Sequence, residues 1–142
     1  MFLLDTNVIS EMRKGHPHGA VLAWFGSVGN LDLHISAVTL GELQAGVEIT
    51  RRQDPIRASD LDRWVDWVSE THSVLPMEGA AFRMWARLFH GESRELSGDA
   101  MIAATAVVHN LVVVTRNVRD FVPFGVRILN PFEASPLVQP AG

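Results

Sequence analysis

The chain has 142 residues, of which 47% are hydrophobic and 20% charged, a balance that supports one compact domain with a substantial buried core. Its formal net charge of −4 disfavours a protein that binds nucleic acid through bulk positive charge. The absence of cysteine excludes disulfides, thiolate metal sites and a thiol nucleophile, so any bound metal must be held by oxygen or imidazole ligands.

The two ends of the sequence set expectations about location and domain bounds. Asp5 places a charge too early for a signal peptide, and no apolar run approaches the ~18 residues of a membrane span. We therefore expect a cytoplasmic protein with no membrane partner. Residues 1–133 are expected to form the domain, and residues 134–142 a flexible surface tail that contains two prolines.

In the first part of the chain, short apolar runs alternate with helical patterns. Phe2–Leu4 predicts a buried strand that turns into a helix at residues 5–7. Residues 21–25 predict a helix, and residues 31–35 alternate as a second strand. The next helix is predicted to begin at Thr39 and to end near Arg51.

The rest of the chain continues this alternation. In chain order it predicts a helix at 61–68, a strand at 73–76, helices at 81–89 and 99–109, and strands at 111–114 and 126–129. The apolar surface of the helix at 81–89 extends beyond one stripe, since Phe82 and Phe89 widen it, and this suggests a homodimer contact. Strands separated by helices predict an α/β fold, a five-stranded parallel sheet flanked by helices in three α/β/α layers.

Acidic residues recur where the predicted strands end or the helices begin. They are Asp5, Glu42, Asp99 and Asp120, with the amide Asn117 as an alternative to the last. Ligand sites in parallel sheets lie outside the carboxyl ends of the strands, and carboxylates gathered there bind a hard divalent cation. The constellation therefore predicts a metal-dependent nuclease.

Each acid also has a purely structural explanation. Asp5 can cap the helix that follows it. Thr39 and Glu42 have the spacing of a capping box, which by itself explains a glutamate at position 42. Asp99 suits the positive end of its helix dipole, and Asp120 can be an ordinary loop acid. The joint placement of all four at one sheet edge favours the functional interpretation.

Neighbouring polar residues have supporting roles in this hypothesis. Thr6 and Asn7 are expected to hydrogen-bond the first acid, and Thr115 to orient the metal-bound water or the fourth acid; the alternative is that they are turn and strand-end residues. Ser97 is either a supporting group or a helix cap. Eleven of the twelve basic residues are arginine, which can form forked contacts with phosphate. Near the acids these are Arg116 and Arg119, predicted to contact RNA or else to form a solvated surface.

Four motifs together carry a family resemblance. They are Leu-Leu-Asp-Thr-Asn-Val-Ile-Ser from Leu3, Gly-Glu-Leu from Gly41, Asp-x-x-Ile-Ala-Ala-Thr-Ala from Asp99, and Thr-Arg-Asn-x-x-Asp-Phe from Thr115, followed by Leu-Asn-Pro-Phe from Leu129. With them, residues 2–132 resemble the PIN domain of VapC-type toxins from bacterial toxin–antitoxin pairs, including FitB-like proteins.

The resemblance implies a ribonuclease that hydrolyses RNA phosphodiesters. It also implies a Mg²⁺ or Mn²⁺ ion held by Asp5, Glu42 and Asp99, with position 117 or 120 completing the group, and a cognate antitoxin that blocks the site. The chain departs from the plainest family pattern at Asn117, because an amide supplies neither charge nor a base. A non-catalytic binding module of this fold is therefore an alternative. A metal-dependent phosphatase is disfavoured, since Asn7 occupies the second place of its Asp-x-Asp pair.

Overall fold

Five short strands form one parallel sheet in the computed structural model, which describes all 142 residues. They are β1 (Phe2–Leu4), β2 (Leu33–Ser36), β3 (Ser73–Leu75), β4 (Val112–Val114) and β5 (Ile128–Leu129). Their order across the sheet is β3-β2-β1-β4-β5, and every pair is parallel. β1 is central, with Leu4 opposite Ile35 on one side and Val114 on the other. The predicted five-stranded parallel sheet is confirmed.

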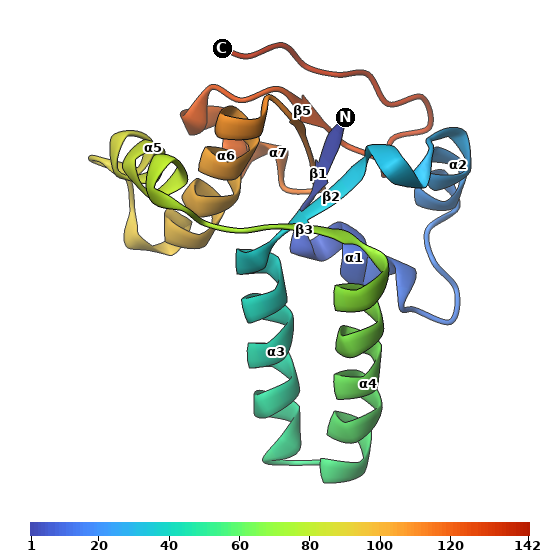
Figure 1. The fold of residues 1–142 in the computed structure, drawn as a ribbon. Coiled ribbons are helices and arrows are strands. Elements are labelled where there is room, and N and C mark those ends of the chain that lie inside the picture. Colours follow the sequence, from blue (N-terminus) through green and yellow to red (C-terminus); the bar gives the residue numbers. More distant parts are fainter.

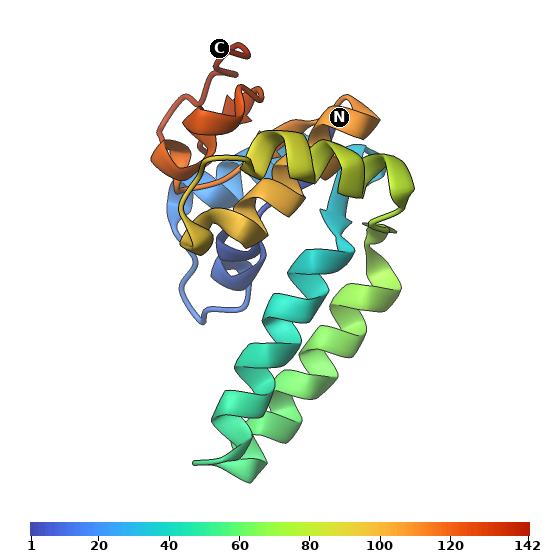
Figure 2. The ribbon, with the colours of Figure 1, turned by 90° about the vertical axis from the view of Figure 1, so that its left-hand side faces the viewer.

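Seven α-helices surround the sheet (Figure 1). They are α1 (Thr6–Met12), α2 (Gly19–Ser27), α3 (Ala37–Arg51), α4 (Pro55–Thr71), α5 (Gly79–Phe89), α6 (Ser97–His109) and α7 (Val118–Phe121). α3 and α4 pack side by side and project from the sheet as an arm, which Figures 1 and 2 show from two directions. None of the helices combines the length and apolar character that crossing a membrane requires.

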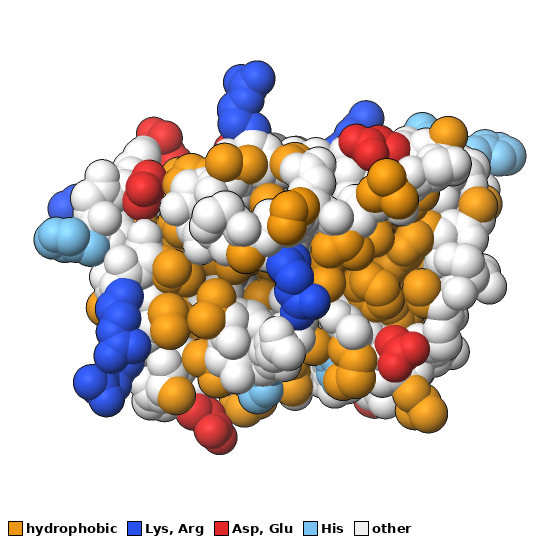
Figure 3. All heavy atoms as spheres, turned by 90° about the horizontal axis from the view of Figure 1, so that it is seen from above, with side chains coloured by type: hydrophobic (Ala, Val, Ile, Leu, Met, Phe, Trp, Pro, Cys, Tyr) orange, Lys and Arg blue, Asp and Glu red, His pale blue; other side chains and the backbone are white.

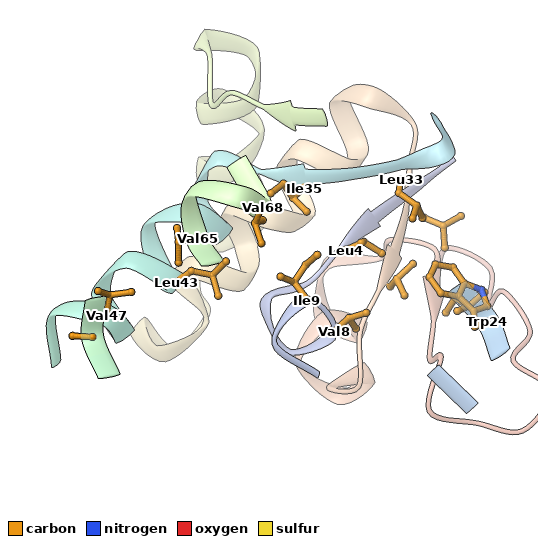
Figure 4. Packing of buried hydrophobic residues seen from close by; sticks show 14 residues of the cluster. Leu4, Val8, Ile9, Trp24, Leu33, Ile35, Leu43, Val47, Val65 and Val68 are labelled. Carbon is orange, nitrogen blue, oxygen red and sulfur yellow. The ribbon is translucent and has the colours of Figure 1, made fainter. Parts of the chain in front are cut away.

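Alternation along the strands separates two hydrophobic clusters, one on each face of the sheet. Leu4 and Ile35 face the cluster that contains Val8 and Ile9 of α1 and extends into the arm. Figure 4 shows these residues together with Leu43, Val47, Val65 and Val68 of α3 and α4. Leu3 points the other way, into a cluster built largely from α6 and the segment around α7. The predicted three-layer arrangement is confirmed.

Several predicted boundaries differ from those in the structure; the largest difference is in the helix predicted at 61–68, which spans Pro55–Thr71, and two shifts of two residues have a clear local cause. The second strand begins at Leu33 rather than 31, because residues Asn30–Asp32 form a 3-10 turn in which Leu31 is 93% exposed. α3 begins at Ala37 rather than Thr39, since Ser36 has extended backbone and its Oγ accepts a hydrogen bond from the Val38 N–H at 3.1 Å.

The second of these corrections removes one explanation of Glu42. Thr39 lies inside α3 and is fully buried, so Thr39 and Glu42 do not form a capping box. The glutamate at position 42 is one turn into the helix and needs another reason for its placement.

The C-terminal tail runs back along the sheet. Although we expected residues 134–142 to be loose, Gln139 exchanges two backbone hydrogen bonds with Ile128 of the edge strand, at 2.7 and 3.1 Å. Leu137 and Val138 beside it are exposed. Figure 3 views the molecule from this end, where apolar side chains gather between scattered charges.

Candidate metal and nucleic-acid site

The candidate site lies where the strand order reverses. From central β1 the chain builds β2 and β3 to one side, and β4 and β5 to the other. Asp5 directly follows β1 and Thr115 directly follows β4, so the two residues leave neighbouring parallel strands at the same edge. In parallel sheets this is the usual position of a ligand site.

Asp5 is held firmly by its surroundings. It is 4% exposed; its Oδ1 accepts from the Thr6 N–H at 2.8 Å, and its Oδ2 accepts from the Thr115 hydroxyl at 2.8 Å and from the Asn7 amide at 3.1 Å. Burial raises the pKa of Asp5, and the bonds from Thr115 and Thr6 oppose that rise. Asp5 also caps α1, so the structural and functional explanations of this residue coexist.

Thr115 ties the loop after β4 to the loop after β1. Besides donating to Asp5, its hydroxyl accepts from the Asn117 N–H at 2.9 Å, and the neighbouring Arg116 N–H donates to Asn7 Oδ1 at 3.2 Å. Asn117 thus contributes its backbone, while its side chain is exposed and caps no helix. Thr6, Asn7 and Thr115 all gather around the first acid; the Thr115 hydroxyl, which we expected to orient the metal-bound water or the fourth acid, donates to Asp5 instead.

Asp99 lies in the first turn of α6 and is partly buried. Its pKa is raised to about 7 by desolvation and then by the charges of Asp5, Asp120 and Glu42, in that order. Asp120 is partly buried and Glu42 is exposed, so both carboxylates are less enclosed than Asp5. The fold therefore brings all four predicted acids into one electrostatically coupled group, which we call the acidic group.

Glu42 reaches this group from α3. Its pKa is raised by desolvation and by the Asp5 charge, and the nearby Thr6 side chain opposes the rise. A Cβ placed on Gly98 would lie 3.8 Å from Glu42 Oε1, so the start of α6 passes close to this carboxylate. With the capping box excluded, proximity to Asp5 and Thr6 is the contact that explains its position.

The donor chemistry of the acidic group fits a hard cation. All four side chains offer carboxylate oxygens, the ligands that Mg²⁺ and Mn²⁺ prefer, and their mutual repulsion is the kind that a divalent charge relieves. In this conformation no three Asp, Glu or His side chains converge closely enough to enclose an ion. The four carboxylates thus influence one another's ionisation, but they do not converge on a single ion position in this conformation.

Three other predicted residues lie outside this coupling. Ser97 is the first residue of α6 and its side chain makes no capping bond; its carbonyl oxygen accepts from Trp85 Nε1 at 3.3 Å. Arg116 is exposed, with its guanidinium carbon 4.6 Å from the centroid of the Phe132 ring. Arg119 is exposed on α7. Neither arginine is in an ion pair, so both are free to contact another molecule.

Two contacts beside the acidic group have no signal in the sequence. The Thr6 hydroxyl donates to the hydroxyl of buried Thr39 at 3.3 Å, which links α1 to α3 one turn before Glu42. Arg13 lies over the ring of Trp64, 5.8 Å from its centroid. Trp64 is 51 positions after Arg13, and no motif signals their meeting.

Comparisons with known proteins identify the family and the fold. Residues 2–122 match the family model described as the PIN domain. The chain is 37% identical to the VapC ribonuclease Y4jK of Sinorhizobium fredii over 94% of its own length and 99% of that protein. It is 32% identical to the toxin FitB of Neisseria gonorrhoeae over 93% and 99%. The crystal structure of FitAcB from Neisseria gonorrhoeae superposes with a TM-score of 0.82 at 31% identity, over 94% of this chain and 99% of that one.

Proposed function

Since the chain belongs to the PIN domain family, we propose that it is a metal-dependent endoribonuclease and acts as the toxin of a toxin–antitoxin pair in the cytoplasm. The observation that carries the proposal is the gathering of four carboxylates near one sheet edge, where desolvation and then the charges of Asp5, Asp120 and Glu42 raise the pKa of Asp99 to about 7. Such an environment disfavours the ionised carboxylate in the metal-free protein, and a catalytic cation site accounts for its retention. The names of the relatives Y4jK and FitB, a ribonuclease and a toxin, support the same assignment.

Asp5, Glu42 and Asp99 would hold the Mg²⁺ or Mn²⁺ ion, with Asp120 as the fourth acid. We prefer Asp120 to Asn117 because the Asp120 charge raises the pKa of both Asp5 and Asp99. When bound, the cation supplies positive charge that stabilises the phosphate undergoing hydrolysis.

The remaining residues orient and bind. Thr115 and Asn7 hold the Asp5 carboxylate in one orientation through bonds of 2.8 and 3.1 Å, so this acid needs no reorganisation when substrate arrives. Arg116 and Arg119, exposed and without ion pairs, shortly precede the acid Asp120 in the sequence and would contact RNA phosphates. Together they provide a fixed acid and a local positive rim in a chain of net negative charge.

Cleavage of RNA tests the proposal directly. Purified protein is incubated with a panel of tRNA and mRNA fragments in Mg²⁺, in Mn²⁺ or in chelator, beside Asp99→Asn and the control Asp66→Asn, which alters an exposed acid of α4. We expect cutting only with metal, at least ~100-fold slower in Asp99→Asn and unchanged in Asp66→Asn. Cutting that persists in chelator, or folded protein that binds Mn²⁺ and cuts none of the panel, would contradict it.

An antitoxin is the proposed protein partner. A cavity of about 290 Å³ separate from the acidic group is lined mainly by apolar side chains of α1, α2, β2 and α4, among them Met12, Phe25 and Trp67. Trp67 is 54% exposed and would be covered by an apolar helix from the partner. Co-purification with the product of the adjacent gene, lost in Trp67→Glu, is the expected result; failure of the wild type to bind it would remove this partner.

A homodimer is the second proposed assembly. On α5, Phe82 is 46% exposed, and Trp85 stacks on Phe89 with ring centroids 5.4 Å apart. An exposed aromatic surface of this kind is typical of an interface core. Light scattering should give twice the monomer mass of 15.7 kDa for the wild type and the monomer mass for Phe82→Glu. A monomeric wild type would exclude the dimer.

A further inference from the structure

A cavity of about 260 Å³ opens beside the acidic group, between α1 and the arm. Thr6 and Glu42 line one end of it, and Arg13 and Trp64 line the other. Glu42 belongs to the acidic group, and Thr6 hydrogen-bonds Asp5. When a phosphate of an RNA chain lies at the acids, the nucleotide next to that phosphate is therefore within reach of the cavity. The hydrolysis proposed above does not itself use this cavity.

The far end of the cavity presents two flat groups. Arg13 is exposed at the end of α1, and its guanidinium carbon lies 5.8 Å from the centroid of the partly buried Trp64 ring. An indole and a guanidinium plane are the surfaces on which unpaired nucleobases stack. Neither salt bridge nor hydrogen bond occupies the Arg13 side chain, so its charge is available to a ligand.

The rest of the lining has a mixed character. Five of the eleven lining residues are hydrophobic, and the others include the hydroxyl residues Ser10 and Thr50 and the carboxylate of Glu42. Hydroxyl and carboxylate oxygens accept from the exocyclic amines and ring N–H groups of a base, whereas an apolar peptide side chain leaves them unpaired. The volume is below the ~300 Å³ at which pockets for drug-sized ligands begin, and suits one ring-sized group.

We propose that this cavity binds the base of the unpaired nucleotide next to the phosphate that is cleaved, and so selects the sequence at that position. The proposal rests on the proposed ribonuclease function and names a substrate contact for it. The base enters between α1 and the arm and stacks on Trp64 and Arg13, and its edge meets the Ser10 and Thr50 oxygens.

Gly46 offers a way to fill the cavity without touching the acidic group. It lines the cavity from α3, and a Cβ built on it meets no atom within 4 Å. A larger side chain in the interior of a helix also improves helix propensity over glycine, so Gly46→Leu is expected to fold. Ala45 is exposed on the same helix and does not line the cavity, which makes Ala45→Leu the matched control.

Arg13 provides a second, independent variant. Arg13→Lys keeps the charge and removes the planar group, so it separates stacking from general attraction of phosphate. Arg52→Lys makes the same exchange at an exposed arginine at the end of α3, outside the cavity, and serves as its control.

The experiment measures RNA binding apart from cleavage. All variants are placed in the Asp99→Asn background, so that the RNA stays intact, and are titrated in Mg²⁺ with a fluorescein-labelled eight-nucleotide single-stranded RNA, by anisotropy. A second oligonucleotide series carries one abasic position at each site in turn. We expect Gly46→Leu and Arg13→Lys to weaken binding about tenfold and the two controls to change it less than about twofold. At one position, removal of the base should weaken RNA binding by the parent protein and leave RNA binding by Gly46→Leu unchanged.

Unchanged RNA affinity in Gly46→Leu, or the same abasic effects in Gly46→Leu and the parent, would overturn the base-binding role. Loss of antitoxin binding with unchanged RNA affinity would assign the cavity to the protein partner instead, and would overturn it too. The ribonuclease function is judged separately by cleavage in the protein with Asp99 intact. Failure of one proposal is therefore distinguishable from failure of the other.

Discussion

The Asp5 end and the Asp99 end of the acidic group are held in opposite ways. Asp5 is 4% exposed and accepts three hydrogen bonds from the protein. Asp99 is more open, and the only influences that shift its pKa are desolvation and three negative charges, all of which raise it. The protein thus supplies hydrogen-bond donors to Asp5, whereas the negative charge of Asp99 is left to be balanced by a bound cation.

This difference assigns separate tasks to the two ends. A buried carboxylate with fixed donors keeps its orientation whether or not a ligand is present. A carboxylate surrounded by like charges is destabilised until a cation arrives, so it couples ligand binding to stability. Variants at the two ends should therefore differ in the sign of their effect on stability.

Thr115→Val should produce the largest effect, a loss of about 2 kcal/mol in the free energy of unfolding near pH 8, because a buried charged acceptor loses its donor. The lost bond also raises the pKa of Asp5 further above its unfolded value. The loss should therefore shrink as the pH falls below that pKa, where Asp5 is protonated.

Urea denaturation in chelator at several pH values measures this effect. Thr115→Ser retains the hydroxyl and should stay within ~1 kcal/mol of the wild type. An equal loss in the serine and valine variants would mean that packing of the methyl group, rather than the bond to Asp5, holds this end of the site.

Asp99→Asn should have the opposite sign and stabilise the metal-free protein. The folded pKa of about 7 exceeds the unfolded value of 3.8, so the wild type loses stability as the pH rises between these values. The shift corresponds to about 4 kcal/mol in full. Solvent screening at this partly exposed side chain reduces the expected gain to about 1–2 kcal/mol at pH 8.

The gain should fade toward pH 4, where Asp99 of the wild type is protonated. Denaturation curves for both proteins in chelator give the comparison, and Asp66→Asn is the control for loss of one exposed negative charge. If Asp99→Asn is less stable than the wild type at pH 8, groups of the protein itself, and not a bound cation, balance the negative charge of Asp99.

Asp120→Asn should have the smallest effect of the three substitutions. Its effect on Mn²⁺ affinity decides whether Asp120 or Asn117 completes the acidic group beside Asp99. Because the Asp120 charge raises the pKa of Asp99, its removal should lower that pKa and weaken Mn²⁺ binding about three- to tenfold. Asn117→Ala should change Mn²⁺ binding less than about twofold, because the Asn117 side chain is exposed. Calorimetric titration with Mn²⁺ measures both, and the reverse ranking would make the amide at 117 the ligand.

Much of the fold was predictable because its signals are local. The apolar runs at Phe2–Leu4 and Val112–Val114 and the small-residue helix after Asp99 each identify their element without knowledge of the rest. The start of α3 was not predictable in this way, since Ser36 and Thr39 are both residue types that favour the N-cap of a helix. The choice depends on where β2 ends, and the pairing of Ser36 with Leu75 of β3 sets that end.

The placement of the acids was predictable and their individual environments were not. In a parallel sheet the end of a strand and the start of a helix that leads into the next strand lie at the same edge, which predicts that Asp5 and Asp99 lie near each other. One of the three bonds to Asp5 comes from a threonine 110 positions away, and the Arg13 contact with Trp64 depends on how the arm crosses α1. Such long-range contacts follow from tertiary packing, which no local pattern encodes.

The central position of β1 also times the completion of the site during synthesis. Thr115, the hydrogen-bond partner of Asp5 from β4, leaves the ribosome 110 residues after Asp5. At ~5–20 residues per second, translation needs about 5–20 s to supply that partner. Through this interval the nascent chain lacks the Thr115 donor to Asp5 and, for most of it, Asp99. A growing polypeptide therefore cannot complete the proposed site until Thr115 has been synthesised.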